Sequence, residues 1–154
     1  MSWLSGKDIQ NTIEKYGSNE TKKAFLGVFS LDTLPHNLPH LPILLVVNTD
    51  TKNLPGQHWK AVYISNERYG EVFDSLAMPV SIHLQRWMNS FSHRWKSSNV
   101  IIQNPLSPSC GAFVLYYVLI RLSKPTMSSC LKLFSKNLYD NDNLVRNFVK
   151  DLEI

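Results

Sequence analysis

Residues 109–120 read SCGAFVLYYVLI, a cysteine followed by a continuous apolar run. The loop before it, residues 103–108, reads QNPLSP and holds two prolines among small polar side chains. A run that is apolar on every face predicts a helix buried on most of its sides. Because a helix begins with unpaired N–H groups and the positive end of its macrodipole, it stabilises a thiolate at its first residue. The stretch therefore predicts a buried central helix that begins at a candidate nucleophile, Cys110.

The composition sets the broad class. The chain has 154 residues, 44% of them hydrophobic, and we expect one domain over residues 1–154 with a core of its own. Two cysteines are too few for a disulfide framework, which favours a reducing, intracellular setting. The apolar runs fall short of the roughly 20 residues that span a bilayer, so we expect no membrane contact.

The charge is mildly basic, with a formal value of +4 and a pI of about 9.1. The basic residues are scattered and are densest at Lys22 and Lys23 and around Arg86, Arg94 and Lys96. This distribution favours an ordinary solvated surface, and weak, salt-sensitive contact with nucleic acid is the alternative.

Apolar runs of strand length predict four strands, at residues 43–48, 59–65, 71–74 and 99–103. The first is apolar throughout, which is typical of a buried central strand. The short segment 66–70 joins the second and third strands and predicts a hairpin. The prolines between residues 35 and 42 predict irregular structure there.

Helical periodicity predicts three more helices around the one at Cys110. The first follows a capping box at residues 5–8 and ends at Gly17. The second begins after Ser81 and extends its apolar face as far as Trp95. Asp140 or Asn141 caps the last. The fold class is therefore α+β: a central mixed or antiparallel sheet packed against the helix that begins at the cysteine, with peripheral helices.

A cysteine nucleophile needs a base, a group that orients the base and a donor for the oxyanion. His58 begins a predicted strand, which is a rigid place for a base. Asp74 ends the next strand, so the hairpin predicts it beside His58, where a carboxylate fixes the imidazole tautomer. Gln103 precedes the cysteine loop, and its side-chain amide together with the N–H of Cys110 predicts an oxyanion hole. Taken singly, Asp74 also suits a turn and Gln103 an ordinary strand end.

The remaining histidines carry weaker signals. His36 and His40 have the i, i+4 spacing of metal ligands, but their proline-rich loop favours a solvated role and we expect no metal site.

Four motifs in this order resemble the adenovirus-type endopeptidases (adenain) and the related Ulp1-like SUMO proteases. They are GQHW at 56–59, FDSL at 73–76, QNP at 103–105 and SCG at 109–111. The segments FLG at 25–27 and PTM at 125–127 also resemble adenain. The resemblance implies a catalytic set with these roles: general base and acid His58, orienting acid Asp74, oxyanion donor Gln103 and nucleophile Cys110.

The resemblance implies further roles near the sulfur. Trp59 would line the approach to it and favour small residues, typically glycine, before the scissile bond. Gly111 would let backbone approach closely at the start of the helix. Asp74 replaces the glutamate of adenain and is closer to the Ulp1-like pattern.

The resemblance implies a cysteine endopeptidase that cleaves viral capsid or core precursor proteins. Two alternatives stay open: a processing protease for a ubiquitin-like protein (ubiquitin, SUMO or NEDD8), and a non-catalytic binding module on the same fold. The chemistry would need no cofactor, and the protein would act as a monomer in the host cytoplasm or nucleus, or packaged in a virion. Activation by DNA or a viral peptide is implied as well. Residues 100–102 hold no cysteine, so such a peptide would lack the adenain-type disulfide.

Overall fold

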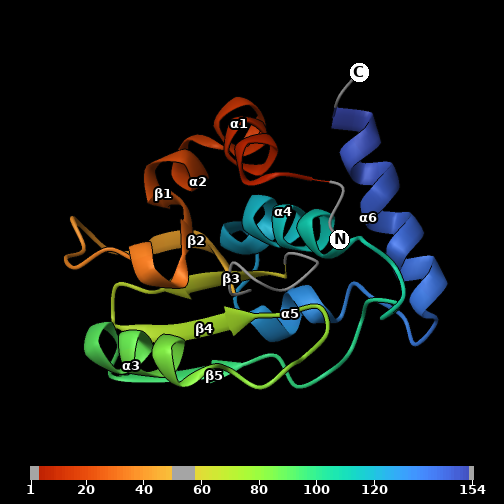
Figure 1. Ribbon diagram of the computed structural model, residues 1–154. Coiled ribbons are helices and arrows are strands. Elements are labelled where there is room, and N and C mark those ends of the chain that lie inside the picture. Colours follow the sequence, from red (N-terminus) through yellow and green to blue (C-terminus); the bar gives the residue numbers. More distant parts are fainter. Residues whose placement is uncertain (1–3, 50–57, 153–154) are drawn as a thin grey trace.

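The computed structural model describes residues 4–49 and 58–152. Within them, five strands form one mixed sheet in the order β1-β2-β3-β4-β5 (Figure 1). The strands are Phe25–Ser30 (β1), Ile43–Asn48 (β2), Trp59–Ile64 (β3), Tyr69–Phe73 (β4) and Arg94–Ser97 (β5). The outer pairs β1–β2 and β4–β5 are parallel, whereas β2–β3 and β3–β4 are antiparallel. The sheet therefore confirms the predicted mixed arrangement and the hairpin formed by β3 and β4.

Six α-helices surround the sheet in the described part of the chain. They are Gly6–Tyr16 (α1), Asn19–Ala24 (α2), Ile82–Phe91 (α3), Cys110–Ile120 (α4), Met127–Leu131 (α5) and Leu138–Leu152 (α6). The capping box before α1 is present, with the Ser5 side chain accepting from Asp8 N–H and the Asp8 carboxylate accepting from Ser5 N–H. Among the described residues, no helix is both long and apolar enough to cross a bilayer.

The strand β2 shows why the sheet is buried on both faces. Leu44 and Val46 pack with α4 and α1 on one face, whereas the alternate side chains pack with α3 on the other. All of its apolar side chains from residue 43 to 47 are fully buried. Since successive strand residues point to opposite faces, only a strand covered on both sides accepts a continuous apolar run.

The helix α4 forms the centre of the larger core. It lies between the sheet and the helices α1 and α6 (Figure 1). It is buried on most of its sides, as the sequence predicted, and Tyr116, Leu119 and Ile120 are partly buried. Its far end is tied to β4 by a buried ion pair, in which Nη2 of Arg121 lies 2.7 Å from Oε1 of Glu71. The α+β class with a buried helix that begins at Cys110 is therefore confirmed.

The predicted fourth strand was wrong. Residues 99–103 are not a strand, and β5 at Arg94–Ser97 takes the place beside β4 instead. Val100 and Ile101 are about half exposed, and in this apolar run Ile102 is the residue that enters the core. The amides of Ile102 and Gln103 both donate to the carbonyl of Ser75, which turns the segment toward the loop that precedes Cys110.

Two helix boundaries also differ from the prediction. The helix α3 ends at Phe91, and Trp95 lies in β5, where its indole N–H donates to Asn89 Oδ1. The last helix begins at Leu138, before the predicted caps. The Asn137 side chain accepts from the N–H of Asp140, so Asn137 rather than Asp140 or Asn141 occupies the capping position.

Candidate active site

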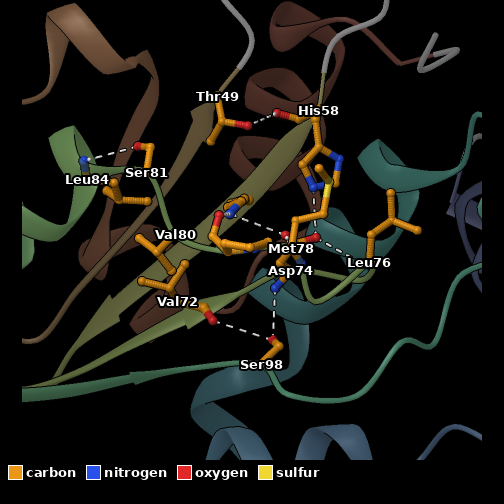
Figure 2. Close-up of polar contacts among 12 residues, drawn as sticks. Thr49, His58, Val72, Asp74, Leu76, Met78, Val80, Ser81, Leu84 and Ser98 are labelled. Atoms are coloured by element: carbon orange, nitrogen blue, oxygen red, sulfur yellow. Dashed lines mark hydrogen bonds and ion pairs between the residues drawn. The ribbon is translucent and has the colours of Figure 1, made fainter.

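His58 stands directly before β3, at the open end of the β3–β4 hairpin. Its carbonyl accepts hydrogen bonds from the backbone N–H and the hydroxyl of Thr49, next to the end of β2 (Figure 2). These contacts fix the backbone of His58 to the neighbouring strand. The imidazole side chain is mostly buried, with 13% of its surface exposed.

His58 and Asp74 are in direct contact, as the hairpin predicted. Nε2 of His58 lies 2.8 Å from Oδ1 of Asp74 (Figure 2). This contact engages Nε2 and leaves Nδ1 as the ring nitrogen that faces other partners. A hydrogen bond also joins the His58 side chain to Cys110. The imidazole therefore bridges the carboxylate of Asp74 and the thiol at the start of α4.

The Asp74 carboxylate is buried but well supplied with donors. Oδ1 also accepts from the N–H of Leu76 at 2.9 Å, and Oδ2 accepts from the N–H of Met78 at 3.0 Å. The ammonium group of Lys60 lies 3.3 Å from Oδ2. Burial would raise the pKa of Asp74, yet the hydrogen bond and charge of His58, the Leu76 amide and the Lys60 charge together lower it. Asp74 is therefore ionised at neutral pH.

The electrostatics of His58 favour the charged imidazole. Burial would lower the pKa of His58, but hydrogen bonds to Asp74 and Cys110 and their negative charges raise it from 6.5 to about 9. At neutral pH the imidazolium is the dominant form. A charged imidazole in contact with Cys110 suits a stored thiolate–imidazolium pair, the form in which a cysteine is most nucleophilic.

The two cysteines lie in different surroundings. Cys110 is the first residue of α4, next to His58, and 5% of its surface is exposed. Cys130 is buried within α5, and burial raises its thiol pKa to about 11. Cys130 is therefore a structural thiol, whereas Cys110 has the contact that a nucleophile needs.

Gln103 is buried and held at both ends of its amide. Its Oε1 accepts from the hydroxyl of Ser75 at 2.6 Å, and its Nε2 donates to the carbonyl of Ser107 at 2.9 Å. The amide nitrogen is thereby directed at the loop that carries Cys110. This arrangement suits an oxyanion donor, and the role of Gln103 stays a prediction.

The helix α6 holds the same loop from outside, a contribution that the sequence did not predict. The Asn141 side-chain amide donates to the carbonyl of Ile102, and Asp142 accepts from the N–H of Asn104. Further along the helix, Nε of Arg146 donates to the hydroxyl of Ser109. Side chains of α6 thus form hydrogen bonds with both ends of the segment 102–109, which leads to Cys110.

The remaining predicted residues lie close by without a demonstrated role. Trp59 is buried against Gly6 at the start of α1, and its indole N–H has no hydrogen-bond partner among the described residues. Gly111 is buried in the first turn of α4. Their proposed contacts with substrate stay predictions. In the described part of the chain, no three His, Cys, Asp or Glu side chains cluster as metal ligands would.

Comparison with known proteins finds solved structures with a similar fold. The chain is similar to the crystal structure of the ASFV pS273R protease, with a TM-score of 0.61 and 18% identity over 82% of this chain and 60% of that one. It has the fold of that protease. The selenomethionine form of the same protease gives a TM-score of 0.60 at 18% identity, covering 82% of this chain and 61% of that one. The chain therefore spans about 60% of the length of this protease.

A second solved structure has a similar size to this chain. The central domain of the uncharacterized Lpg1148 protein from Legionella pneumophila gives a TM-score of 0.52 and 15% identity, covering 98% of this chain and 96% of that one. No protein-family model and no curated protein sequence matches the chain. These likenesses support the expected protease fold without singling out adenain.

Proposed function

We propose that the protein is a cysteine peptidase with Cys110 as its nucleophile. The observation that carries the proposal is the chain of contacts from Asp74 through His58 to Cys110, at the start of a buried helix. The likeness to the ASFV pS273R protease supports it at the level of the fold.

The proposed reaction uses the charged pair directly. The Cys110 thiolate attacks the carbonyl carbon of the scissile peptide bond, and the oxyanion that forms accepts hydrogen bonds from Gln103 Nε2 and the Cys110 N–H. The His58 imidazolium then gives its proton to the departing amine, and the C–N bond breaks to leave a thioester. A water molecule gives a proton to His58 and attacks the thioester, which releases the acid and restores the thiolate–imidazolium pair.

Asp74 keeps the imidazole in the orientation that this sequence of proton transfers needs. Its contact with Nε2 leaves Nδ1 toward the sulfur, and its charge stabilises the imidazolium. With the pKa of His58 raised to about 9, the histidine acts first as the acid that protonates the leaving amine. It acts as a base in the second half of the reaction, when it accepts a proton from the attacking water.

We propose protein substrates cleaved after small residues such as glycine, with viral capsid or core precursors as the first class to examine. The resemblance of the four motifs to adenain supports this class, and the likeness to the ASFV pS273R protease supports a protease at the level of the fold. The Asp-Ser-Leu context at residues 74–76 supports the second class, ubiquitin-like proteins that end in Gly-Gly. We further propose a reducing intracellular setting, which would preserve the thiols of Cys110 and Cys130.

The test is a mass-spectrometric cleavage profile on a peptide library, with and without added DNA. The wild-type protein and a Cys130→Ala control should cleave the same peptides, whereas Cys110→Ala should cleave none. Vinyl sulfone probes built on ubiquitin, SUMO and NEDD8 separate the substrate classes through adducts on Cys110. Undiminished cleavage by Cys110→Ala, or a folded wild-type protein inert toward every peptide and probe, would overturn the proposal.

A further inference from the structure

Lys60 is a buried cation beside the candidate active site. Only 3% of its surface is exposed, although it carries a long charged side chain in the middle of the sheet. Its ammonium group lies 3.3 Å from Oδ2 of Asp74 and donates to the carbonyl of Pro79, also at 3.3 Å. A buried ammonium is retained only when it is paired and hydrogen-bonded, and both partners of Lys60 belong to the strand end and loop that carry the acid.

The register of the hairpin explains this position. The last registered pair of β3 and β4 is Ala61 opposite Phe73, so the next step outward places Lys60 opposite Asp74. His58 lies directly before β3 and Lys60 is the second residue of that strand, and both side chains contact Asp74. The two side chains therefore bracket the carboxylate, with His58 on Oδ1 and Lys60 on Oδ2.

The carboxylate is saturated by this arrangement. Oδ1 contacts the His58 imidazole and accepts from the N–H of Leu76, whereas Oδ2 forms an ion pair with Lys60 and accepts from the N–H of Met78. Within the described chain, the charged groups that act on Asp74 are His58 and Lys60, and Cys110 on α4 contacts the far side of the imidazole. Lys60 thus occupies Oδ2, so Oδ1 stays with the imidazole.

We propose that Lys60 is a positioning residue, whose ammonium group occupies Oδ2 of Asp74 and directs Oδ1 at His58. The inference rests on the proposed function, because Asp74 matters to catalysis through His58. Lys60 also acts on His58 through its charge. Its positive charge opposes the protonation of His58, so the imidazolium gives up its proton to the leaving amine more readily than it would beside Asp74 alone.

The test is the NMR titration of the His58 imidazole in wild-type, Lys60→Gln and Lys60→Arg proteins. Glutamine keeps a side-chain donor but loses the charge, so the His58 midpoint should rise by about one pH unit. Arginine keeps the charge, and its midpoint should stay at the wild-type value. Peptide cleavage by Lys60→Gln should show kcat about 10-fold lower at an unchanged KM, with recovery in Lys60→Arg.

A second measurement needs no variant and covers the case in which Lys60→Gln does not fold. In the wild-type protein, the ¹⁵N resonance of the Lys60 ammonium should shift with the same midpoint as His58. The inference would be overturned if folded Lys60→Gln had the same His58 midpoint as wild type. It would also be overturned if the Lys60 ¹⁵N resonance did not shift while His58 titrates. Both titrations are independent of turnover, so an inert protein with coupled titrations refutes the peptidase proposal alone.

Discussion

The hydroxyl of Ser75 donates a hydrogen bond of 2.6 Å to the amide oxygen of Gln103. Both side chains are almost fully buried, so this bond decides which end of the amide faces the catalytic loop. The nitrogen end then donates to the carbonyl of Ser107, between Gln103 and the nucleophile. Ser75 directly follows Asp74, and the loop after β4 therefore orients both the candidate base His58 and the candidate oxyanion donor Gln103.

Replacing Ser75 should weaken catalysis more than binding. In Ser75→Ala the Gln103 oxygen loses its buried donor, which costs about 1–3 kcal/mol and frees the amide to rotate. We expect kcat to fall by about 10-fold with little change in KM, because an oxyanion contact acts in the transition state. Steady-state kinetics on a cleaved peptide measure this. Ser107→Ala is the matched control, since the Ser107 hydroxyl makes only a long 3.4 Å contact with Gln103 Nε2. Equal kcat values for the two variants would contradict the role of Ser75.

The hydrogen bonds between α6 and the loop before Cys110 give a second prediction. The Asn141 side chain donates to the carbonyls of Ile102 and Ser135, and its oxygen accepts from the N–H of Ser135. Asn141→Ala should therefore lower the free energy of unfolding by about 1–3 kcal/mol and reduce kcat. Asn143 lies on the same helix but is exposed, so Asn143→Ala should stay within about 0.5 kcal/mol of wild type. Urea denaturation and peptide cleavage compare Asn141→Ala with Asn143→Ala. Equal stability and equal kcat in the two variants would contradict the role of α6 in holding the loop.

The raised pKa of His58 predicts a pH-dependent stability. A folded-state pKa of about 9, against 6.5 for the ordinary imidazole, means that protonated His58 stabilises the native protein. The contribution is complete below about pH 6.5 and is lost as the pH rises through about 9. Urea denaturation should show wild type losing up to about 3 kcal/mol over this window relative to His58→Gln. The exposed His83 provides the control variant His83→Gln, which should follow wild type. A constant difference between wild type and His58→Gln would contradict the shifted pKa.

The sequence predicted the parts of the structure that depend on neighbouring residues. The continuous apolar runs of β2 and α4 and the capping box of α1 are local signals, and their elements form as expected. The hairpin predicted the contact of His58 with Asp74 because strand register propagates from the turn. Residues 100–102 are all β-branched, which is typical of a strand, but the place beside β4 in the sheet is taken by β5.

Long-range polar contacts explain what sequence reasoning missed. Nothing near Asn141 or Arg146 in the chain indicates that they bind a loop more than thirty residues earlier. Lys60 did carry a readable signal, since it is a charged residue in an otherwise apolar strand, two residues after His58. That signal becomes informative only once the register places it opposite Asp74.

The alkylation of the two thiols by iodoacetamide at pH 6 tests the central claim most directly, with each site followed by peptide mapping. The contact with the His58 imidazolium should make Cys110 reactive, whereas Cys130 is buried and its pKa is raised to about 11. We predict that wild-type Cys110 reacts at least about 100-fold faster than Cys130, and that His58→Gln removes most of this advantage. Equally slow alkylation of both thiols, or a Cys110 rate that His58→Gln leaves unchanged, would contradict a catalytic Cys110–His58 pair.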